Sequence, residues 1–173
     1  ELREVIHAFA DESEGRHKGV DAALLLGRHR VVDQVVTLPK IFALAEASVG
    51  MGFRAGQIKG SVKRQGDAAL FLHADQNWVP APFAPHNLFM TFCIPCEGMT
   101  EEGGATRVVP GSHRVHRPPT REEMNSTESI PVEVEQGSVV VWDGSVWHGN
   151  SERTIPGTPH DRGTNQACSE SCN

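Results

Sequence analysis

Long apolar runs are absent from this sequence. No stretch of the 173-residue chain approaches the roughly 20 apolar residues that cross a bilayer, and no charged and then apolar leader opens it. We therefore expect a soluble, cytoplasmic protein without a membrane partner. The first residue is Glu1 rather than methionine, so we also expect native N-terminal residues to be missing.

Positive charge is scarce as well. The chain carries 16 Lys and Arg against 22 Asp and Glu, for a net charge of -6, and its cationic residues are scattered. Proteins that bind nucleic acid need a basic patch to neutralise phosphates. The composition therefore predicts no nucleic-acid partner.

Cysteine is too sparse for a disulfide framework. The 4 cysteines form two couples, Cys93 with Cys96 and Cys168 with Cys172. A tetrahedral zinc site built from both couples is the minor alternative, because the second couple has one spacer residue more than the first. Cys93 falls inside a strand pattern, where a buried thiol is ordinary packing.

The length and the apolar periodicity predict a single domain, residues 1–173, with a helical flank over residues 1–50. Leu2, Val5, Ile6 and Phe9 have the spacing of an amphipathic helix. A second helix is expected from Pro39 to about Gly50. These helices carry no chemical groups of note, and we expect them to pack on the outside of a sheet.

From residue 51 the sequence changes to short strands separated by turns. Strands are expected near residues 57–63, 68–75, 87–94, 130–134 and 138–142, with Gly and Pro between them. This pattern predicts a mainly β fold with flanking helices, of the double-sheet jelly-roll type, over residues 51–157. Residues 158–173 show no strand alternation and are expected to form a C-terminal tail of uncertain structure.

Two of these strands carry the chemistry. In an extended strand the side chains of His73 and Asp75 leave from one face, while Ala74 points away. His148 follows the strand at 138–142, and a jelly roll can bring it beside the first pair. Two imidazoles and one carboxylate with an open opposite face form the 2-His-1-carboxylate triad, which favours non-heme Fe(II).

Three stretches together resemble the phytanoyl-CoA dioxygenase family of Fe(II)- and 2-oxoglutarate-dependent oxygenases, over about residues 50–155. They are His73–Asp75 with the aromatic and proline loop that follows, Gly103–His113, and Gly137–Gly149. The resemblance implies a double-stranded β-helix, which is a cupin-like jelly roll, with Fe(II), O2 and 2-oxoglutarate as cosubstrate. It implies hydroxylation of a small-molecule or lipid-like substrate, with 2-oxoglutarate decarboxylated to succinate and CO2.

The resemblance also assigns roles to single residues. It makes His73, Asp75 and His148 the iron ligands, Thr91 and Asn150 contacts of 2-oxoglutarate, and Gln76, Trp78 and Phe83 the substrate side. It gives Arg107 and Ser112 structural roles, the first by pairing with an acid and the second by fixing a turn. Trp142 is expected in the core, and Trp147 in the core or in a pocket wall.

The sequence departs from the family after the distal histidine. Relatives hold the far carboxylate of 2-oxoglutarate with a basic residue, usually arginine, about eleven residues later, because its planar fork matches a carboxylate. Here that position is Pro159. Arg162 is the nearest arginine beyond it and is the candidate, whereas Arg153 is expected to point outward.

Two other functions therefore stay open. One is a catalytically silent jelly roll that keeps the metal or only the fold as a binding module. The weaker one is a zinc hydrolase with the same three ligands, for which no acidic residue is obviously placed as general base. The sequence indicates neither the substrate nor the oligomeric state.

Overall fold

The computed structural model describes residues 1–13, 21–156 and 165–172. Its elements, in chain order, are α1 (Leu2–Ser13), β1 (Asp21–Ala22), α2 (Arg30–Val36), α3 (Pro39–Val49), β2 (Ala55–Lys63), β3 (Leu70–His73), β4 (Met90–Pro95), β5 (Thr106–Val108), η1 (Ser112–Val115), α4 (Glu123–Ser126), β6 (Ile130–Pro131), β7 (Val140–Asp143), β8 (His148–Asn150) and β9 (Asn165–Cys172).

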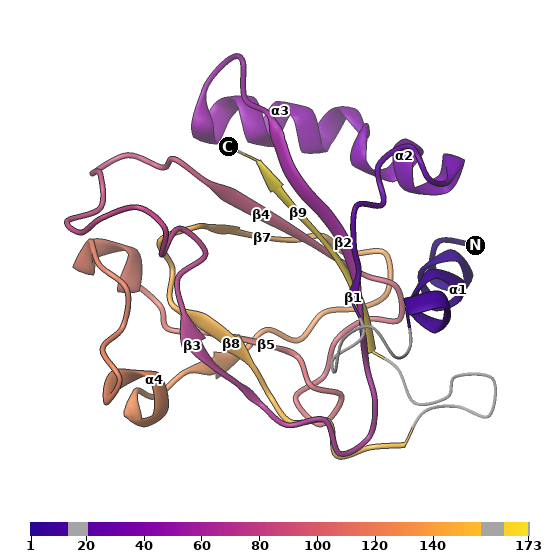
Figure 1. The fold of residues 1–173 in the computed structure, drawn as a ribbon. Helices are drawn as coiled ribbons and strands as arrows, with labels where there is room; N and C mark the ends of the chain where they lie inside the picture. The colour runs from indigo at the N-terminus through magenta and orange to yellow at the C-terminus, as the bar shows by residue number, and fades with distance from the viewer. Residues whose placement is uncertain (14–20, 157–164, 173) are drawn as a thin grey trace.

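The strands form two antiparallel sheets, which lie one above the other in Figure 1. The five-stranded sheet has the order β1-β2-β9-β4-β7, and the four-stranded sheet has the order β3-β8-β5-β6. Successive strands mostly alternate between the two sheets, because β2, β4, β7 and β9 lie in the first sheet and β3, β5, β6 and β8 lie in the second. Strands β3 and β8, far apart in the sequence, are neighbours in the second sheet.

Helices α1, α2 and α3 lie along the outer face of the five-stranded sheet, whereas α4 lies near the four-stranded sheet (Figure 1). The apolar face of α1 is buried through Ile6 and Ala10, which pack in one cluster with Ile58 and Val62 of β2. Helix α3 packs in the same way on β4. The two predicted helices are therefore present, and no helix in the described part of the chain is long and apolar enough to cross a membrane.

Strand alternation decides which side chains face the other sheet. Because Ile58 and Val62 face the helices, Lys59 and Lys63 on the same strand face inward. On β4, Met90 and Phe92 contact the helical side, so Thr91 and Cys93 face inward. The inner face of the five-stranded sheet therefore carries polar groups as well as apolar ones.

The sequence left the structure of residues 158–173 uncertain, and the described part of this segment, Asn165–Cys172, is strand β9. Strand β9 lies in the middle of the five-stranded sheet and pairs with β2 on one side and β4 on the other. Its sequence, Asn165–Cys172, has no apolar alternation, so propensity gives no strand signal. Pairing with two flanking strands holds it instead.

The register of β9 also excludes the zinc site built from both cysteine couples. Cys172 lies opposite Met90, while Cys168 lies opposite Ile94. Cys96 is six residues beyond Met90, about 20 Å along an extended strand, which is far outside the reach of one tetrahedral ion. Cys93 and Cys96 are free thiols, and Cys93 is buried as expected.

Candidate metal centre

Three side chains converge at one end of the four-stranded sheet. Strands β3 and β8 pair so that His73 lies directly opposite His148, and Asp75 follows two residues later. The Oδ1 atom of Asp75 is 3.4 Å from Nε2 of His148 and 3.7 Å from Nε2 of His73. One ligand atom from each residue lies within 4.8 Å of the other two, so the group could hold a metal ion.

A β-bulge sets this register. Leu70 pairs with Asn150, yet His73 pairs with His148, so β3 has one residue more than β8 over the same span. Without the extra residue, Leu72 and not His73 would face His148. The bulge needs Gly149, because a Cβ atom there would lie 2.4 Å from the carbonyl oxygen of Leu70.

Both imidazole rings are oriented by backbone carbonyl groups. His148 Nδ1 is 2.9 Å from the carbonyl oxygen of Val146, and His73 Nδ1 is 3.2 Å from that of Phe71. A carbonyl oxygen only accepts, so each Nδ1–H donates, and Nε2 is the ring nitrogen left to bind a metal ion.

The two oxygens of Asp75 have different surroundings. Oδ2 accepts hydrogen bonds from the Thr91 hydroxyl at 2.6 Å and from the Trp142 indole N–H at 3.1 Å. Oδ1 faces only the two imidazoles. Burial acts to raise the pKa of Asp75, but His148, His73 and the Thr91 hydroxyl outweigh it and hold the pKa well below its usual range.

This donor set fits a divalent cation. Two imidazole nitrogens and one ionised carboxylate oxygen face a common point, and hydrogen bonds on the far side of each group fix its direction. His148 is buried, whereas His73 and Asp75 are partly exposed, so the remaining coordination positions face outward.

The comparisons with known proteins agree with this geometry. A family model described as phytanoyl-CoA dioxygenase (PhyH) matches residues 8–154, which is most of the chain. The chain belongs to the phytanoyl-CoA dioxygenase family. This membership confirms the resemblance that the three sequence stretches indicated.

Curated relatives in the family are fungal dioxygenases. Dioxygenase aneA of Aspergillus aculeatus is 38% identical over 89 residues, covering 49% of this chain and 30% of its own length. Dioxygenase af480 of Aspergillus fumigatus is 31% identical over 115 residues, covering 64% of this chain and 36% of its own length. The chain thus spans about a third of the length of these relatives.

Solved structures share the fold at low sequence identity. HygX from Streptomyces hygroscopicus, with nickel and 2-oxoglutarate bound, has a TM-score of 0.77 at 15% identity, covering 99% of this chain and 76% of that one. EctD from S. alaskensis, with bound Fe, also has a TM-score of 0.77, at 14% identity, covering 99% of this chain and 66% of that one.

The residues that the family resemblance assigned to the substrate side have three different environments. Trp78 is 59% exposed and its ring packs edge-on against Phe89. Gln76 is buried, and its Oε1 has no hydrogen-bond partner among the described residues. Phe83 packs with Ala74 and Trp147, on the face of the strands opposite the ligands, so the structure does not place it on the substrate side.

The three cosubstrate candidates also differ. Thr91 is buried and donates to Asp75, so its partner is a carboxylate of the protein itself. Asn150 Oδ1 accepts from the Leu70 N–H and from Lys63 Nζ. Arg162 lies outside the described residues. Arg153, expected to point outward, is instead buried, and its guanidinium donates to the carbonyl groups of Gly103 and Pro156.

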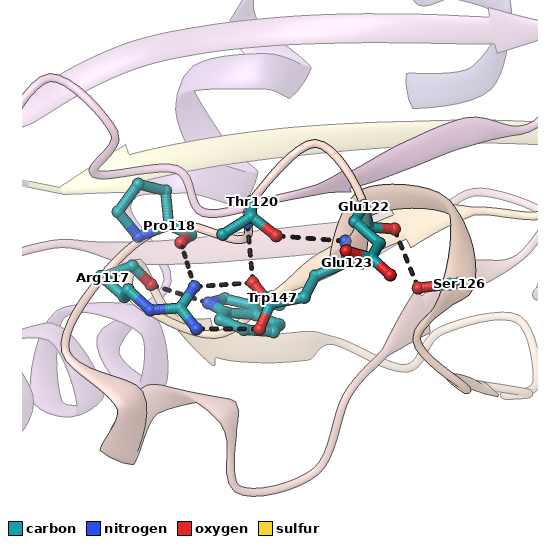
Figure 2. Close-up of polar contacts among 7 residues, drawn as sticks. All are labelled: Arg117, Pro118, Thr120, Glu122, Glu123, Ser126 and Trp147. Atoms are coloured by element: carbon teal, nitrogen blue, oxygen red, sulfur yellow. Dashed lines mark hydrogen bonds and ion pairs between the residues drawn. The ribbon is translucent and has the colours of Figure 1, made fainter.

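A network behind His148 holds the strand that carries it. Trp147 is buried, its backbone N–H donates to Ser112 Oγ at 2.8 Å, and its indole N–H donates to the Arg117 carbonyl at 2.8 Å. Figure 2 shows the guanidinium of Arg117 paired with both oxygens of Glu123, at 2.7 and 2.8 Å. Trp147 is therefore a core residue, and Ser112 has the structural role expected of it.

Arg107 has its expected structural role as well. Its guanidinium pairs with Glu101 and donates to the hydroxyl and the carbonyl oxygen of Ser129.

Sequence analysis missed two residues near the site, Trp142 and Lys63. A partly buried indole on a core strand needs an acceptor for its N–H, and Asp75 is the acceptor. The sequence indicates that the Trp142 N–H needs an acceptor. It does not indicate that the acceptor is Asp75, because Asp75 follows a strand of the other sheet. Lys63 shows a signal only in the alternation of β2, where it falls on the inner face.

Proposed function

We propose that the chain is the core of an Fe(II)- and 2-oxoglutarate-dependent dioxygenase, with His73, Asp75 and His148 as the iron ligands. The observation that carries the proposal is the convergence of these three side chains in a member of the phytanoyl-CoA dioxygenase family. The curated relatives are named dioxygenases, and HygX and EctD, which share the fold, were solved with a metal ion bound.

We further propose that the two sheets form a double-stranded β-helix, the cupin-like jelly roll, within one domain. The antiparallel pairings and the crossings between sheets are of the kind this fold uses. In this arrangement residues 1–50 form the helical flank, and β9 belongs to the core with residues 51–157. The iron would then lie at the end of the barrel where β3 and β8 meet.

Iron held by these residues would supply the oxidation chemistry, in which O2 and 2-oxoglutarate yield succinate, CO2 and a hydroxylated substrate. The chain's own residues bind and orient. His73, His148 and Asp75 Oδ1 would hold the ion, and Thr91 and Trp142 donate to Oδ2, which directs Oδ1 towards the metal position. Three protein ligands would leave coordination positions for 2-oxoglutarate and O2.

The substrate is proposed to be a small or lipid-like molecule that enters from the partly exposed side of the site. Trp78 and the proline-rich loop that follows it adjoin the ligand segment, and the exposed indole offers an apolar contact. Gln76, directly after Asp75, adds a buried amide oxygen that has no partner among the described residues. Both residues remain proposed substrate-side residues.

Anaerobic titration with Fe(II) and then 2-oxoglutarate tests the function. A visible charge-transfer band is expected when 2-oxoglutarate chelates iron at the site, and an Asp75→Ala variant should lose it. Lys40→Ala, on an exposed part of α3, is the matched surface control and should keep the band.

The outcomes separate the three candidate functions. Iron uptake without the band favours the binding module, since the cosubstrate site would then be incomplete. Purified protein that contains zinc and rejects Fe(II) favours the hydrolase. Failure of the wild-type chain to bind any divalent metal contradicts all three uses of the triad.

A further inference from the structure

Helix α3 carries apolar side chains around most of its circumference. Ile41 and Ala45 face the five-stranded sheet and are buried, whereas Phe42 and Leu44 remain 46% and 48% exposed. A helix that is apolar on every side is normally covered on every side. The outer side of α3 lies at the outside of the molecule in Figure 1, and the described residues leave it exposed.

Two alanines form the centre of this outer side. An α-helix turns by about 100° per residue, so Ala43 and Ala47 point away from the buried pair Ile41 and Ala45. Both alanines are exposed. The distance between two packed helices depends on the side chains at the contact, so small residues here allow a second helix to approach closely.

The exposed apolar surface extends beyond the helix. Phe42 forms one wall of a hollow of about 320 Å³ that Leu26 and Phe53 also line. Leu26 is exposed, and Met51, which follows the end of α3, is 86% exposed. Exposed apolar surface that gathers in one region of a soluble protein marks an interaction site.

Two charges of opposite sign border the two alanines. Lys40 lies three residues before Ala43, Glu46 lies three residues after it, and both are exposed. Neither Lys40 nor Glu46 forms an ion pair with another described residue. This side of α3 is therefore neutral, although the whole chain carries a net charge of -6, which opposes self-association through most other surfaces.

We propose that two copies of this chain associate through α3, packed antiparallel around a two-fold axis beside Ala43. A two-fold interface uses the same surface twice, so that surface must complement itself. Lys40 and Glu46 lie equally far from Ala43, about 4.5 Å along the helix, so this axis sets Lys40 of each copy at the level of Glu46 of the other. A parallel pair would instead set like charges against each other.

The same axis brings the apolar side chains together. Phe42 and Leu44 flank Ala43 on opposite sides of the helix, one residue before it and one after it. Antiparallel packing places Phe42 of the two copies side by side along one border of the contact, and Leu44 of the two copies along the other. The part of each side chain that is exposed in the single chain would thus be covered.

Sedimentation equilibrium over a range of protein concentrations tests the proposal. Lys40→Glu sets two acidic side chains against each other at both ends of the contact, so the Kd of the dimer should rise about tenfold or more. The double variant Lys40→Glu/Glu46→Lys exchanges the two charges and should return the Kd to within about threefold of wild type. Ala43→Arg should give only monomer, because two like charges would meet at the axis.

Arg121→Glu is the matched control, because it changes the net charge as Lys40→Glu does, on an exposed residue just before α4. It should leave the Kd unchanged, and every variant should keep the wild-type circular dichroism spectrum. If Ala43→Arg does not fold, the charge variants decide alone. A wild-type chain that stays monomeric up to about 1 mM overturns the proposal. So does a dimer that Lys40→Glu weakens no more than Arg121→Glu does, or one that the double variant fails to restore.

Discussion

Asp75 contacts side chains from both sheets. Its Oδ1 faces the two imidazoles, and its Oδ2 is held by Thr91 from β4 and Trp142 from β7. A carboxylate with one oxygen engaged in this way can offer only the other to a metal. Partners of this kind fix ligand direction and tune affinity, although they do not touch the ion.

Replacing Trp142 with phenylalanine tests this role. The ring volume is nearly kept, but the N–H that Oδ2 accepts is lost, so we expect metal affinity to fall by about 10- to 100-fold. Competition with a chromophoric chelator measures the affinity. Thr91→Val should act in the same direction, because it removes the second donor to the same oxygen.

Trp147→Phe is the control for indole loss. Its N–H donates to the Arg117 carbonyl and not to a ligand, so metal affinity should stay within a few-fold of wild type.

Because Trp142 also lies 4.9 Å from the His148 ring, its fluorescence should be quenched when Ni(II) binds. Unchanged affinity in both Trp142→Phe and Thr91→Val would show that Asp75 needs no such support.

For single residues, the sequence could predict the metal ligands but not the side chains that donate hydrogen bonds to them. His73 ends β3 and Asp75 follows two residues later, which is a local arrangement, and His148 follows from a motif. Thr91 and Trp142 lie on strands of the opposite sheet, and their distance to Asp75 depends on how the two sheets stack. Residue spacing contains no information on that stacking.

At the scale of elements, the pairing of β3 with β8 decides whether the triad forms. The bulge in β3 moves His73 into register with His148, and the backbone carbonyl groups of Leu70 and Phe71 approach Gly149 closely. A side chain at position 149 would push the two strands apart where two of the three ligands arise.

Gly149→Ala is therefore expected to cost about 1–3 kcal/mol of unfolding free energy, the range for overpacking, and to weaken metal binding as well. Chemical denaturation and chelator competition measure the two effects. Gly66→Ala is the matched control, since it introduces backbone strain at φ 85° with open space around the new methyl group. It should lower stability without changing metal affinity, and equal effects of the two variants on the metal would contradict the bulge argument.

The capping box at α4 offers a pH prediction. Glu123 Oε2 accepts from the Thr120 N–H, Thr120 Oγ1 accepts from the Glu123 N–H, and Arg117 pairs with the same carboxylate (Figure 2). Hydrogen bonding to Arg117 is the main cause that lowers the pKa of Glu123 from 4.5 to about 2. Since the folded pKa is the lower one, this contribution to stability is complete above about pH 4.5 and is lost as the pH falls towards 2.

An NMR titration of the Glu123 carboxyl group measures whether its pKa is lowered in the folded protein. The midpoint should lie near 2 in the wild type and return towards 4.5 in Arg117→Gln. High salt should move the wild-type midpoint in the same direction, because the pair is exposed and screened. A wild-type midpoint near the ordinary value would show that the pair does not persist in solution.

Strand β9 shows where sequence reasoning about elements fails. The helix from Pro39 is a local pattern, and it is present as predicted. The C-terminal strand is polar and has no alternation, so its state depends on the hydrogen-bonding edges that β2 and β4 leave for it. Pairing with strands distant in sequence can therefore outweigh the low intrinsic β-propensity of a segment.

For the molecule as a whole, the site joins elements distant in sequence. Its ligands belong to the segments of β3 and β8, and its supporting donors belong to β4 and β7. An ion bound to all three ligands therefore links segments that unfold together when the sheets separate. Metal binding should consequently be coupled to global stability.

Thermal unfolding with and without metal tests this coupling. An ion that binds only the folded chain stabilises it by about 2.7 kcal/mol when the free ion is at about a hundredfold its Kd. In a chain of this size that raises Tm by roughly 5–11 °C, and excess chelator should reverse the rise. Asp75→Ala should unfold at a Tm that no longer depends on Fe(II), whereas Lys40→Ala should respond like the wild type. A wild-type Tm that is independent of Fe(II) at saturating concentration would mean that the three side chains do not bind the ion together, because a bound ligand must shift the folding equilibrium.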